Sequence, residues 1–412
     1  MIQRVSVCLL TLSVLSVSAV AGDWTQWRGP GHMNIAEQGN TVPTDWSESK
    51  NVIWRTDVPG RGHASPTITG NMVVLSTAHD ASQTQGLVAF DRKTGKQLWI
   101  TPVSQGGFPT IHPKNTHASP TVATDGKHLY ATFFHHLKIE AVALDLNGKI
   151  VWRKDLGGFR PKAYEYGYAA SPTIYKDMLI ISGDCDTIAW LKALKLADGG
   201  VVWEQQRPQS LNWSSPIVAN IAGRDQLLLS GSHMIASYAP ATGKPLWETK
   251  CLTMATCGTC VWEGDLIFAS GGYPDAETVA VKADGSGVVW KNQVKCYEQS
   301  MLVHDGFLYA FADNGVLFCF DAKSGEEMWK QRLTGPVSSS PLLVGDTIFA
   351  TNEAGTTWAF KASGKAYEPI AQNQLGDSGF ASMAAVDGHL FIRTAKGDGP
   401  GRKETLYCIG KK

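Results

Sequence analysis

Eight positions spread along the chain carry side chains that could line a binding site. Each position stands two residues before a Ser or Thr that precedes a short apolar segment, and the set is His63, His117, Ala169, Trp213, Cys257, Glu298, Ser338 and Phe380. An alternation of two keeps each residue on the same side of a strand as its Ser or Thr. His, Cys and Glu are plausible ligands for zinc or copper. A ring of such positions would spread the four potential ligands, so we expect a polar channel lining and no metal site.

A second candidate site lies in one loop, between Phe159 and Tyr168. It combines two cations with three tyrosines, namely Arg160, Lys162, Tyr164, Tyr166 and Tyr168. Aromatic residues and Arg together are typical of recognition surfaces. The alternative is that the loop packs its own aromatic rings onto the rim of the fold, and the sequence leaves both interpretations open.

The cysteines offer a third possibility. Cys257 and Cys260 have CxxC spacing, but Val261 follows where covalent haem attachment needs His. On a regular strand, residues three apart point to opposite faces and lie about 10 Å apart, too far for a disulfide. Seven cysteines follow residue 21, so at least one stays free in a monomer. A Cys257–Cys296 disulfide between neighbouring units and unpaired buried thiols both remain open.

A repeated turn followed by a Trp is the element that must position these residues. Asp91-Arg92-Lys93-Thr94-Gly95 forms such a turn, and Trp99 follows four residues after the Gly. Similar copies recur across the chain, and we expect their Trp residues to pack between neighbouring units: Trp54, Trp99, Trp152, Trp203, Trp247, Trp290 and Trp329. Buried aromatic residues mainly supply core area, so we assign these a structural role.

A second marker, usually Ser-Pro, precedes the first strand of each unit. The eight anchors are Ser65, Ser119, Ser171, Ser215, Thr259, Ser300, Ser340 and Ser382, at steps of 40 to 54 residues. This period suits four short strands per unit, as in a propeller blade. The eighth unit stops after its third strand, whereas residues 51–56 form a strand with no unit of its own. We therefore predict an all-β, eight-bladed β-propeller of four-stranded antiparallel blades over residues 51–412, closed by residues 51–56.

The loops divide into two sets that must lie on opposite faces of such a ring. One set consists of tight Gly and Asp turns, and the other is long and varied, including residues 104–115, 157–167, 271–277 and 394–404. Binding residues concentrate on long loops held by a rigid scaffold. We therefore predict that the long-loop face is functional. Among its polar residues are His112, Lys114 and Tyr273.

The N-terminus has the features of an export signal. Arg4 precedes an apolar run over residues 5–17, and Ala19-Val20-Ala21 fits a cleavage site. We predict a signal peptide over residues 1–21 with cleavage near Ala21, and a periplasmic or cell-envelope location. Residues 22–50 show no periodicity, and we expect an extended lead-in that packs across the outside of the fold. No later apolar stretch is long enough to span a membrane.

The balance of acidic and basic residues argues against nucleic acid as a partner. Lys plus Arg and Asp plus Glu both number 37, and nucleic-acid-binding proteins usually carry a basic surplus. We therefore expect no nucleic-acid partner, and we expect a monomer. The sequence contains no nucleophile elbow, phosphate-binding glycine loop or HExxH motif.

The repeat Ala89-x-Asp91-x-x-Thr94-Gly95-x-x-x-Trp99 resembles that of pyrroloquinoline-quinone (PQQ)-like propellers, over residues 51 to 410. The segment Trp24–Pro30 is similar to the lead-in of exported propellers from planctomycete-type bacteria. One branch, the quinoprotein alcohol dehydrogenases, holds the quinone and calcium beneath a vicinal Cys-Cys disulfide, and no two cysteines are adjacent here. The other branch resembles the eight-bladed, cofactor-free lipoprotein of the outer-membrane barrel assembly machinery. This chain lacks its lipid-anchor Cys.

The resemblance and the residues together favour an exported, non-catalytic propeller. We expect it to act as a binding or scaffold module for a protein or an envelope polymer, through the long-loop face. PQQ and calcium are disfavoured because the channel positions offer one carboxylate, Glu298, whereas calcium needs several oxygen ligands. The alternative is a quinone-dependent oxidoreductase or a degenerate relative of one.

Overall fold

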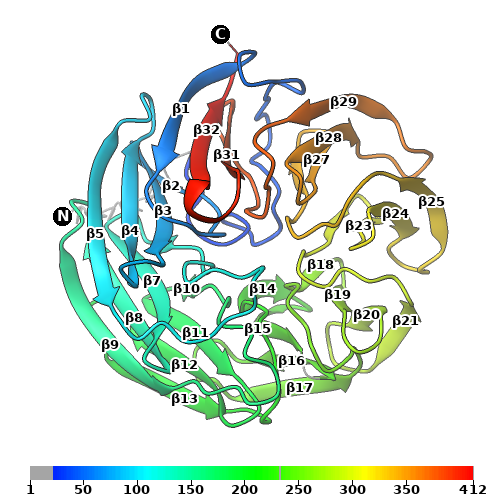
Figure 1. The fold of residues 1–412 in the computed structure, drawn as a ribbon. Coiled ribbons are helices and arrows are strands. Elements are labelled where there is room, and N and C mark those ends of the chain that lie inside the picture. The colour runs from blue at the N-terminus through cyan, green and yellow to red at the C-terminus, as the bar shows by residue number, and fades with distance from the viewer. Residues whose placement is uncertain (1–21, 232, 412) are drawn as a thin grey trace, which may run out of the picture.

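The computed structural model describes residues 22–231 and 233–411, so the predicted signal peptide lies outside the described residues. Eight four-stranded antiparallel sheets form a closed ring (Figure 1). The eight-bladed all-β prediction is confirmed. No helix in the described part of the chain is long and apolar enough to cross a membrane.

The first four blades follow the chain in order, each with its inner strand first. Their strands are β2 (Thr67–Thr69), β3 (Met72–His79), β4 (Thr84–Asp91) and β5 (Gln97–Gln105); β6 (Ala123–Thr124), β7 (His128–His135), β8 (Lys138–Asp145) and β9 (Ile150–Gly158); β10 (Thr173–Tyr175), β11 (Met178–Asp184), β12 (Ala189–Lys195) and β13 (Val201–Gln206); β14 (Ile217–Ile221), β15 (Arg224–Gly231), β16 (Met234–Tyr238) and β17 (Pro245–Lys250).

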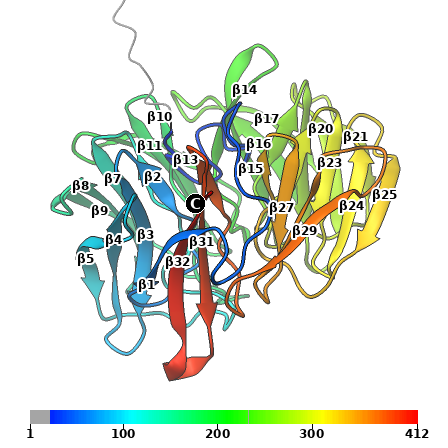
Figure 2. The same cartoon turned by 90° about the horizontal axis from the view of Figure 1, so that it is seen from above.

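Blades 5 to 8 continue in the same way. Their strands are β18 (Val261–Glu263), β19 (Leu266–Gly271), β20 (Glu277–Lys282) and β21 (Val288–Asn292); β22 (Leu302–His304), β23 (Phe307–Phe311), β24 (Val316–Asp321) and β25 (Glu327–Arg332); β26 (Leu342–Val344), β27 (Thr347–Thr351), β28 (Thr356–Lys361) and β29 (Pro369–Gln374); β30 (Ala384–Val386), β31 (His389–Lys396), β32 (Lys403–Ile409) and β1 (Val52–Val58). The hairpin β31–β32 projects from one side of the disc (Figure 2).

The N-terminal strand closes the ring, as predicted. β1 pairs antiparallel with β32, with Trp54 opposite Cys408 and Val58 opposite Glu404. The blue and red strands lie side by side in Figure 1. The pairing spans Val52–Val58, two residues beyond the predicted end, and it leaves blade 8 with the same four strands as the others. Closure removes the open edge that β32 would otherwise present.

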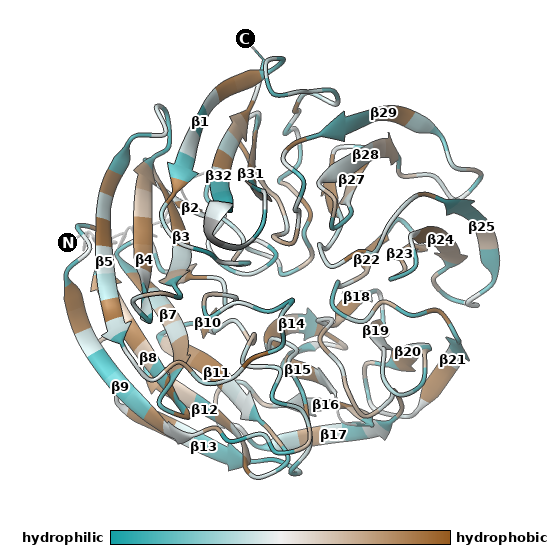
Figure 3. Cartoon of the chain, viewed as in Figure 1, coloured by the Kyte–Doolittle hydropathy of each residue, from teal (hydrophilic) through white to brown (hydrophobic). Residues whose placement is uncertain are grey.

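The middle strands supply most of the core, whereas the outermost strands are more exposed and mix hydrophobic and polar residues (Figure 3). At the rim, the turn Gly of one blade lies flat against the Trp of the preceding blade. A Cβ on Gly95 would lie 2.5 Å from the ring of Trp54, and one on Gly148 would lie 2.7 Å from that of Trp99. The Trp54 Nε1–H donates to the Arg92 carbonyl at 2.9 Å. The repeated Gly and Trp are therefore two halves of one contact between blades.

A ring of hydroxyl groups joins the inner strands. The Ser300 N–H donates to Ser340 Oγ at 2.9 Å, and the Ser340 N–H donates to Ser382 Oγ at 2.9 Å. The same bond joins Thr259 to Ser300. Because most of these hydroxyls accept a backbone N–H that has no sheet partner, the anchors recur just before successive inner strands. Ser65 is an exception, since its Oγ has no hydrogen-bond partner among the described residues.

Blade 2 corrects the predicted anchor. There, Thr121 accepts the Ser65 N–H at 3.1 Å and donates its own N–H to Ser171 Oγ at 2.9 Å, and the strand starts two residues later at Ala123. Ser119, the predicted anchor, therefore stands two residues before the actual anchor, at the position equivalent to His63 of blade 1. Its Oγ bonds within the preceding loop, to Asn115 Oδ1 at 2.6 Å.

The first part of the lead-in does not run across the outside of the fold, so that expectation was wrong for this part, whereas the Trp46 N–H donates to Asn373 Oδ1 of the outermost strand β29 at 2.8 Å. Residues 24–28 cross the axis against the inner strands, and their partners come from blades on opposite sides of the ring. Trp24 pairs with Ile68 of blade 1, the Trp27 indole N–H donates to Thr259 Oγ1 at 3.0 Å, and Arg28 donates to the Met301 carbonyl at 2.9 Å. The inner strands expose carbonyls and hydroxyls at the axis, and the lead-in satisfies them.

Candidate functional site

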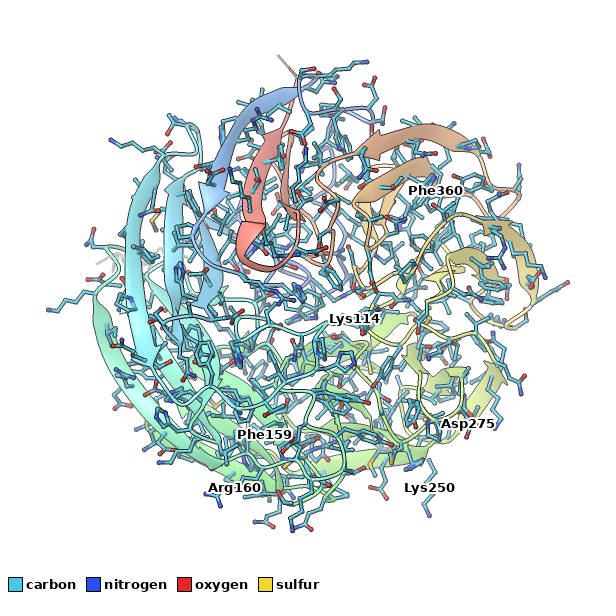
Figure 4. The ribbon with its side chains drawn as sticks, viewed as in Figure 1. Lys114, Phe159, Arg160, Lys250, Asp275 and Phe360 are labelled. Carbon is cyan, nitrogen blue, oxygen red and sulfur yellow. The ribbon has the colours of Figure 1, made fainter. Side chains whose placement is uncertain are left out.

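A cavity of about 260 Å³ occupies the axis of the ring. Trp27 of the lead-in lines it at one end. At the other end the lining comes from the long loops, through His112, Lys114, Tyr166 and Tyr273. The cavity is therefore closed on the tight-turn face and approached from the long-loop face, where Lys114 lies near the centre of the ring (Figure 4).

The structure brings seven of the eight predicted channel positions to this cavity, namely His63, Ala169, Trp213, Cys257, Glu298, Ser338 and Phe380. His117 is the exception, and Ser119 lines the cavity in its place. The shift follows from the blade 2 anchor, because Ser119 stands two residues before Thr121. The ring of His117 instead contacts Phe108, with centroids 3.9 Å apart.

His63 is held as a neutral ring. It stacks on Phe380 with centroids 4.4 Å apart and planes 4° from parallel. Burial, followed by the nearby charges of Arg61 and Arg393, lowers the pKa of His63 well below its ordinary value. A charged imidazolium is therefore disfavoured here, and the cavity gains no cation from this residue.

Aromatic side chains form one part of the wall. Tyr166 stacks on Trp213 with centroids 5.6 Å apart and meets His112 edge-on at 5.0 Å. Tyr164 packs beside Tyr166 at 5.1 Å and edge-on against Tyr273 at 5.6 Å. The Trp213 Nε1–H donates to the Gly167 carbonyl at 2.9 Å, which fixes the indole in the wall.

The predicted loop site between Phe159 and Tyr168 is divided by the structure. Tyr164 and Tyr166 belong to the mouth of the cavity, whereas Tyr168 is buried in the blade core and donates its hydroxyl to the Ser182 carbonyl at 2.9 Å. Arg160 and Lys162 are exposed, and Arg160 lies toward the outer rim in Figure 4. The packing interpretation therefore holds for Tyr168, and recognition by the rest of the loop stays a prediction.

An acidic network forms the neighbouring part of the wall. The Ser338 hydroxyl contacts Glu298 Oε2 and also lies 2.7 Å from Glu353 Oε1, and Lys114 Nζ lies 2.8 Å from the same Glu353 oxygen. Burial raises the pKa of Glu298, the hydrogen bond from Ser338 and the charge of Lys114 oppose this rise, and the charges of Glu353 and Asp313 add to it. The ionised form of this carboxyl group is therefore disfavoured in the cavity.

Sequence reasoning missed several of these residues. Trp27 lay in a segment expected outside the fold, and Ser119 was displaced by the anchor error. Tyr297 lines the cavity just before Glu298, and an alternation of two gave no reason to choose it. Glu353 comes from the short loop between β27 and β28, where only the three-dimensional arrangement brings it to Lys114.

The cysteines are unpaired: Cys185, Cys251, Cys257, Cys260, Cys296, Cys319 and Cys408 are all free thiols. The segment from Cys257 to Cys260 precedes β18 and is not a regular strand, contrary to expectation. Cys257 still faces the cavity while Cys260 lies in the core. Burial raises the pKa of Cys260 to about 12, so this thiol stays protonated. Over residues 22–231 and 233–411, no group of three His, Cys, Asp or Glu side chains could hold a metal ion.

The repeats and the closed eight-bladed ring match a known family. A family model described as outer membrane protein assembly factor BamB matches residues 31–110, 83–315 and 274–399. The chain belongs to this family. Its PQQ-like repeat is therefore confirmed, together with the resemblance to the barrel-assembly propeller.

Individual members of the BamB family are distant relatives. The chain is 24% identical over 366 residues to outer membrane protein assembly factor BamB of Yersinia pestis, covering 86% of this chain and 78% of the relative. It is 24% identical over 346 residues to the protein of the same name from Bordetella pertussis, covering 77% and 76%.

Two solved structures share the fold. BamB from Moraxella catarrhalis superposes with a TM-score of 0.63 at 13% identity, covering 86% of this chain and 96% of that one. Quinohemoprotein alcohol dehydrogenase from Comamonas testosteroni superposes with a TM-score of 0.68 at 13% identity, covering 95% and 81%. At such identities these likenesses establish the fold alone, and the same fold serves a named assembly factor and a named enzyme.

Proposed function

We propose that this protein is an exported, non-catalytic propeller that binds a protein partner of the cell envelope through its long-loop face. One observation carries the proposal. The axis is closed by the lead-in on the tight-turn face, whereas the opposite mouth presents a cluster of partly buried aromatic rings, Tyr164, Tyr166 and Tyr297, beside the exposed Tyr273. Incompletely covered aromatic clusters on a rigid scaffold are typical of protein-binding sites.

The names of the relatives suggest the class of partner. They are named outer membrane protein assembly factors, so we assign the partner to the proteins that take part in assembling the outer membrane. Export follows from the basic start, apolar run and small residues of positions 1–21. N-terminal sequencing of the mature protein from a periplasmic fraction tests this part, and an uncleaved Met1 in the cytoplasmic fraction contradicts it.

The chemistry of the cavity supports a binding role over catalysis. A quinone enzyme holds a flat tri-acidic cofactor beside a divalent cation and needs a base. Here Lys114 is already paired with Glu353, and His63 is kept neutral against Phe380. Three additional carboxylates would meet the buried Glu298 without a free cation to neutralise them. Reconstitution with quinone and calcium is the direct test, and stoichiometric uptake with dye-linked alcohol oxidation would refute the non-catalytic role.

Site-directed photo-crosslinking in intact envelopes tests the binding face. A photoreactive amino acid at Tyr273 reports on the mouth of the cavity. The same group at Lys323, which is exposed in a tight turn between β24 and β25, serves as the matched control on the other face. We expect Tyr273 to crosslink to an outer-membrane assembly protein identified by mass spectrometry. Equal products from both positions, or products from Lys323 alone, would contradict the proposal.

A further inference from the structure

One of three carboxylates at and beside the cavity has no ion-pair partner. Lys114 Nζ lies 2.8 Å from Glu353 and Lys295 Nζ lies 3.5 Å from Asp313. Glu298 forms no ion pair within the part of the chain that the structure describes, and its hydrogen-bonding contact is the Ser338 hydroxyl. The charge of Lys114 also acts on Glu298, but no cation lies within ion-pair distance of this partly buried carboxylate.

Ser338 cannot satisfy both of its acidic neighbours. A hydroxyl has one proton to donate, whereas ionised carboxylates only accept hydrogen bonds. Ser338 Oγ contacts an oxygen of Glu298 and an oxygen of Glu353 at the same time. One of these two contacts therefore brings together acceptor atoms with no proton between them, unless a carboxyl is protonated. A cation placed against Glu298 would relieve this arrangement directly.

We propose that the axial cavity binds an alkylammonium group, which a lysine side chain of the protein partner carries in from the long-loop face. The aromatic wall suits the rest of such a side chain. Its methylene groups can pack against Tyr166 and Trp213, and the π faces of these rings attract a cation. The protein's own Lys114 already places an ammonium group on Glu353 at the same mouth. The cavity disfavours anionic ligands, because no unpaired cation lines it among the described residues.

The geometry favours lysine over arginine. Arg binds carboxylates most strongly when it engages both oxygens in a fork. Glu298 Oε2 is already in contact with Ser338 Oγ, whereas Oε1 makes no such contact among the described residues. A single ammonium point charge needs only that one oxygen. The volume of about 260 Å³ is below the range of drug-sized ligand pockets and is adequate for one extended side chain.

Binding of the ammonium group can be measured without the partner. The mature protein is titrated by calorimetry, at low ionic strength, with the blocked tripeptide acetyl-Gly-Lys-Gly-amide. Norleucine and arginine replace the lysine in two comparison peptides, and maltose serves as a neutral sugar. The variants are Glu298→Gln and the matched control Glu326→Gln, where Glu326 is an exposed residue of a tight turn whose side chain makes no hydrogen bond or ion pair within the described residues.

We expect the lysine peptide to bind at least tenfold more tightly than the norleucine and arginine peptides. Glu298→Gln should weaken it at least tenfold, and Glu326→Gln should leave it unchanged. Glu298→Asp keeps the charge but retracts it, so a several-fold loss is expected, and this variant decides the matter if the Gln variant does not fold. Absence of lysine-peptide binding, equal binding of norleucine, binding of maltose in its place, or wild-type affinity in both Glu298 variants would overturn the inference.

The source of the lysine rests on the proposed function, and the two can fail separately. Lysine-peptide binding that depends on Glu298, without crosslinking from Tyr273, would leave the ammonium site intact and refute the partner protein. Crosslinking from Tyr273 that is unchanged by Glu298→Gln, with no peptide binding, would refute the ammonium site and leave the binding face intact.

Discussion

The rim and the axial cavity use the same eightfold geometry in opposite ways. At the rim, the contact between a turn Gly and a Trp is copied from blade to blade, as in Gly95 with Trp54 and Gly243 with Trp203. At the axis, the residue two positions before the anchor differs between most blades: His63, Ser119, Ala169, Trp213, Cys257, Glu298, Ser338 and Phe380. The fold requires nearly the same pair of residues at each rim contact, whereas it tolerates many different side chains at the cavity. Variation among equivalent positions therefore marks the part of the ring that is available for binding.

The two regions also differ in how well their polar groups are satisfied. Most Trp indoles of the rim donate to carbonyls of the next blade, as Trp99 does to Leu146 at 3.0 Å, and Trp247 donates to Gln226 Oε1 of its own blade. In and around the cavity, burial raises the pKa of Glu298 and that of Asp313. The rim contacts thus stabilise the ring, whereas the burial of charged groups at the cavity lowers the stability of the fold. Substitutions at the two regions should move stability in opposite directions.

Removing the closing strand should have the largest effect. Deletion of residues 23–58 takes away β1 together with Trp24, Trp46 and Trp54, which belong to one buried cluster with strands of blades 1, 7 and 8. The ring would be open at β32, and the axis would lose its plug. We expect no cooperative melting transition by calorimetry. Arg55→Ala in the same strand is the control, because its ion pair with Glu48 is exposed and should contribute little. A deletion variant that melts within a few degrees of the parent would refute closure.

A Gly-to-Ala pair tests whether the rim contact depends on space as well as on backbone conformation. Gly95 has φ +71° and faces Trp54, whereas Gly126 has φ +81° with nothing within 4 Å of an added Cβ. We expect Gly95→Ala to cost about 2–4 kcal/mol, from strain and overpacking together. Gly126→Ala should cost about 1 kcal/mol from strain alone. Equal losses by chemical denaturation would show that the Trp contact is not restrictive.

Two adjacent serines allow the contribution of the hydroxyl ring to stability to be distinguished from the effect of burial alone. Ser339 and Ser340 are both buried, but Ser340 Oγ accepts the Ser300 N–H while Ser339 Oγ has no hydrogen-bond partner within the described residues. Ser340→Ala leaves a buried N–H unpaired and should cost about 1–3 kcal/mol. Ser339→Ala should be neutral or slightly stabilising. If Ser339→Ala lowers the free energy of unfolding in urea more than Ser340→Ala does, the hydroxyl ring contributes nothing to stability.

The smallest effect is expected at the cavity, and its sign is the informative part. Because the pKa of Glu298 is raised in the folded state, the folded protein keeps a proton that the unfolded chain has lost. Stability therefore falls as the pH rises through the raised value, and this penalty disappears below the ordinary carboxyl range near pH 4. Glu298→Gln should raise the melting temperature at pH 7 by about 1 °C, and the difference should vanish on acidification. A lower melting temperature at pH 7 would show that the carboxylate is stabilising.

Much of the architecture was predictable because it is written in local, repeated patterns. The Asp and Gly of a tight turn and the Trp four residues later are set by neighbours in sequence, and their period gave the blade number, the four strands per blade and the closing strand. The long-loop face followed from the same pattern, since alternate connections in an antiparallel blade lie on opposite faces. The seven correctly placed cavity positions also followed, although they precede the inner strands, because their spacing from the hydroxyl anchor is repeated in each blade.

Only the tertiary structure decided the features that depend on contacts between blades. Ser119-Pro120 matches the local pattern of an anchor as well as the other copies do, yet the hydrogen bonds from Ser65 and to Ser171 select Thr121. The lead-in has no periodicity, so its place on the axis is fixed by partners as distant as Thr259 and Met301. Likewise, Glu353 of blade 7 meets Lys114, which lies in the loop between blades 1 and 2. A sequence pattern specifies which way a side chain leaves its own strand, but it does not specify which distant group that side chain meets.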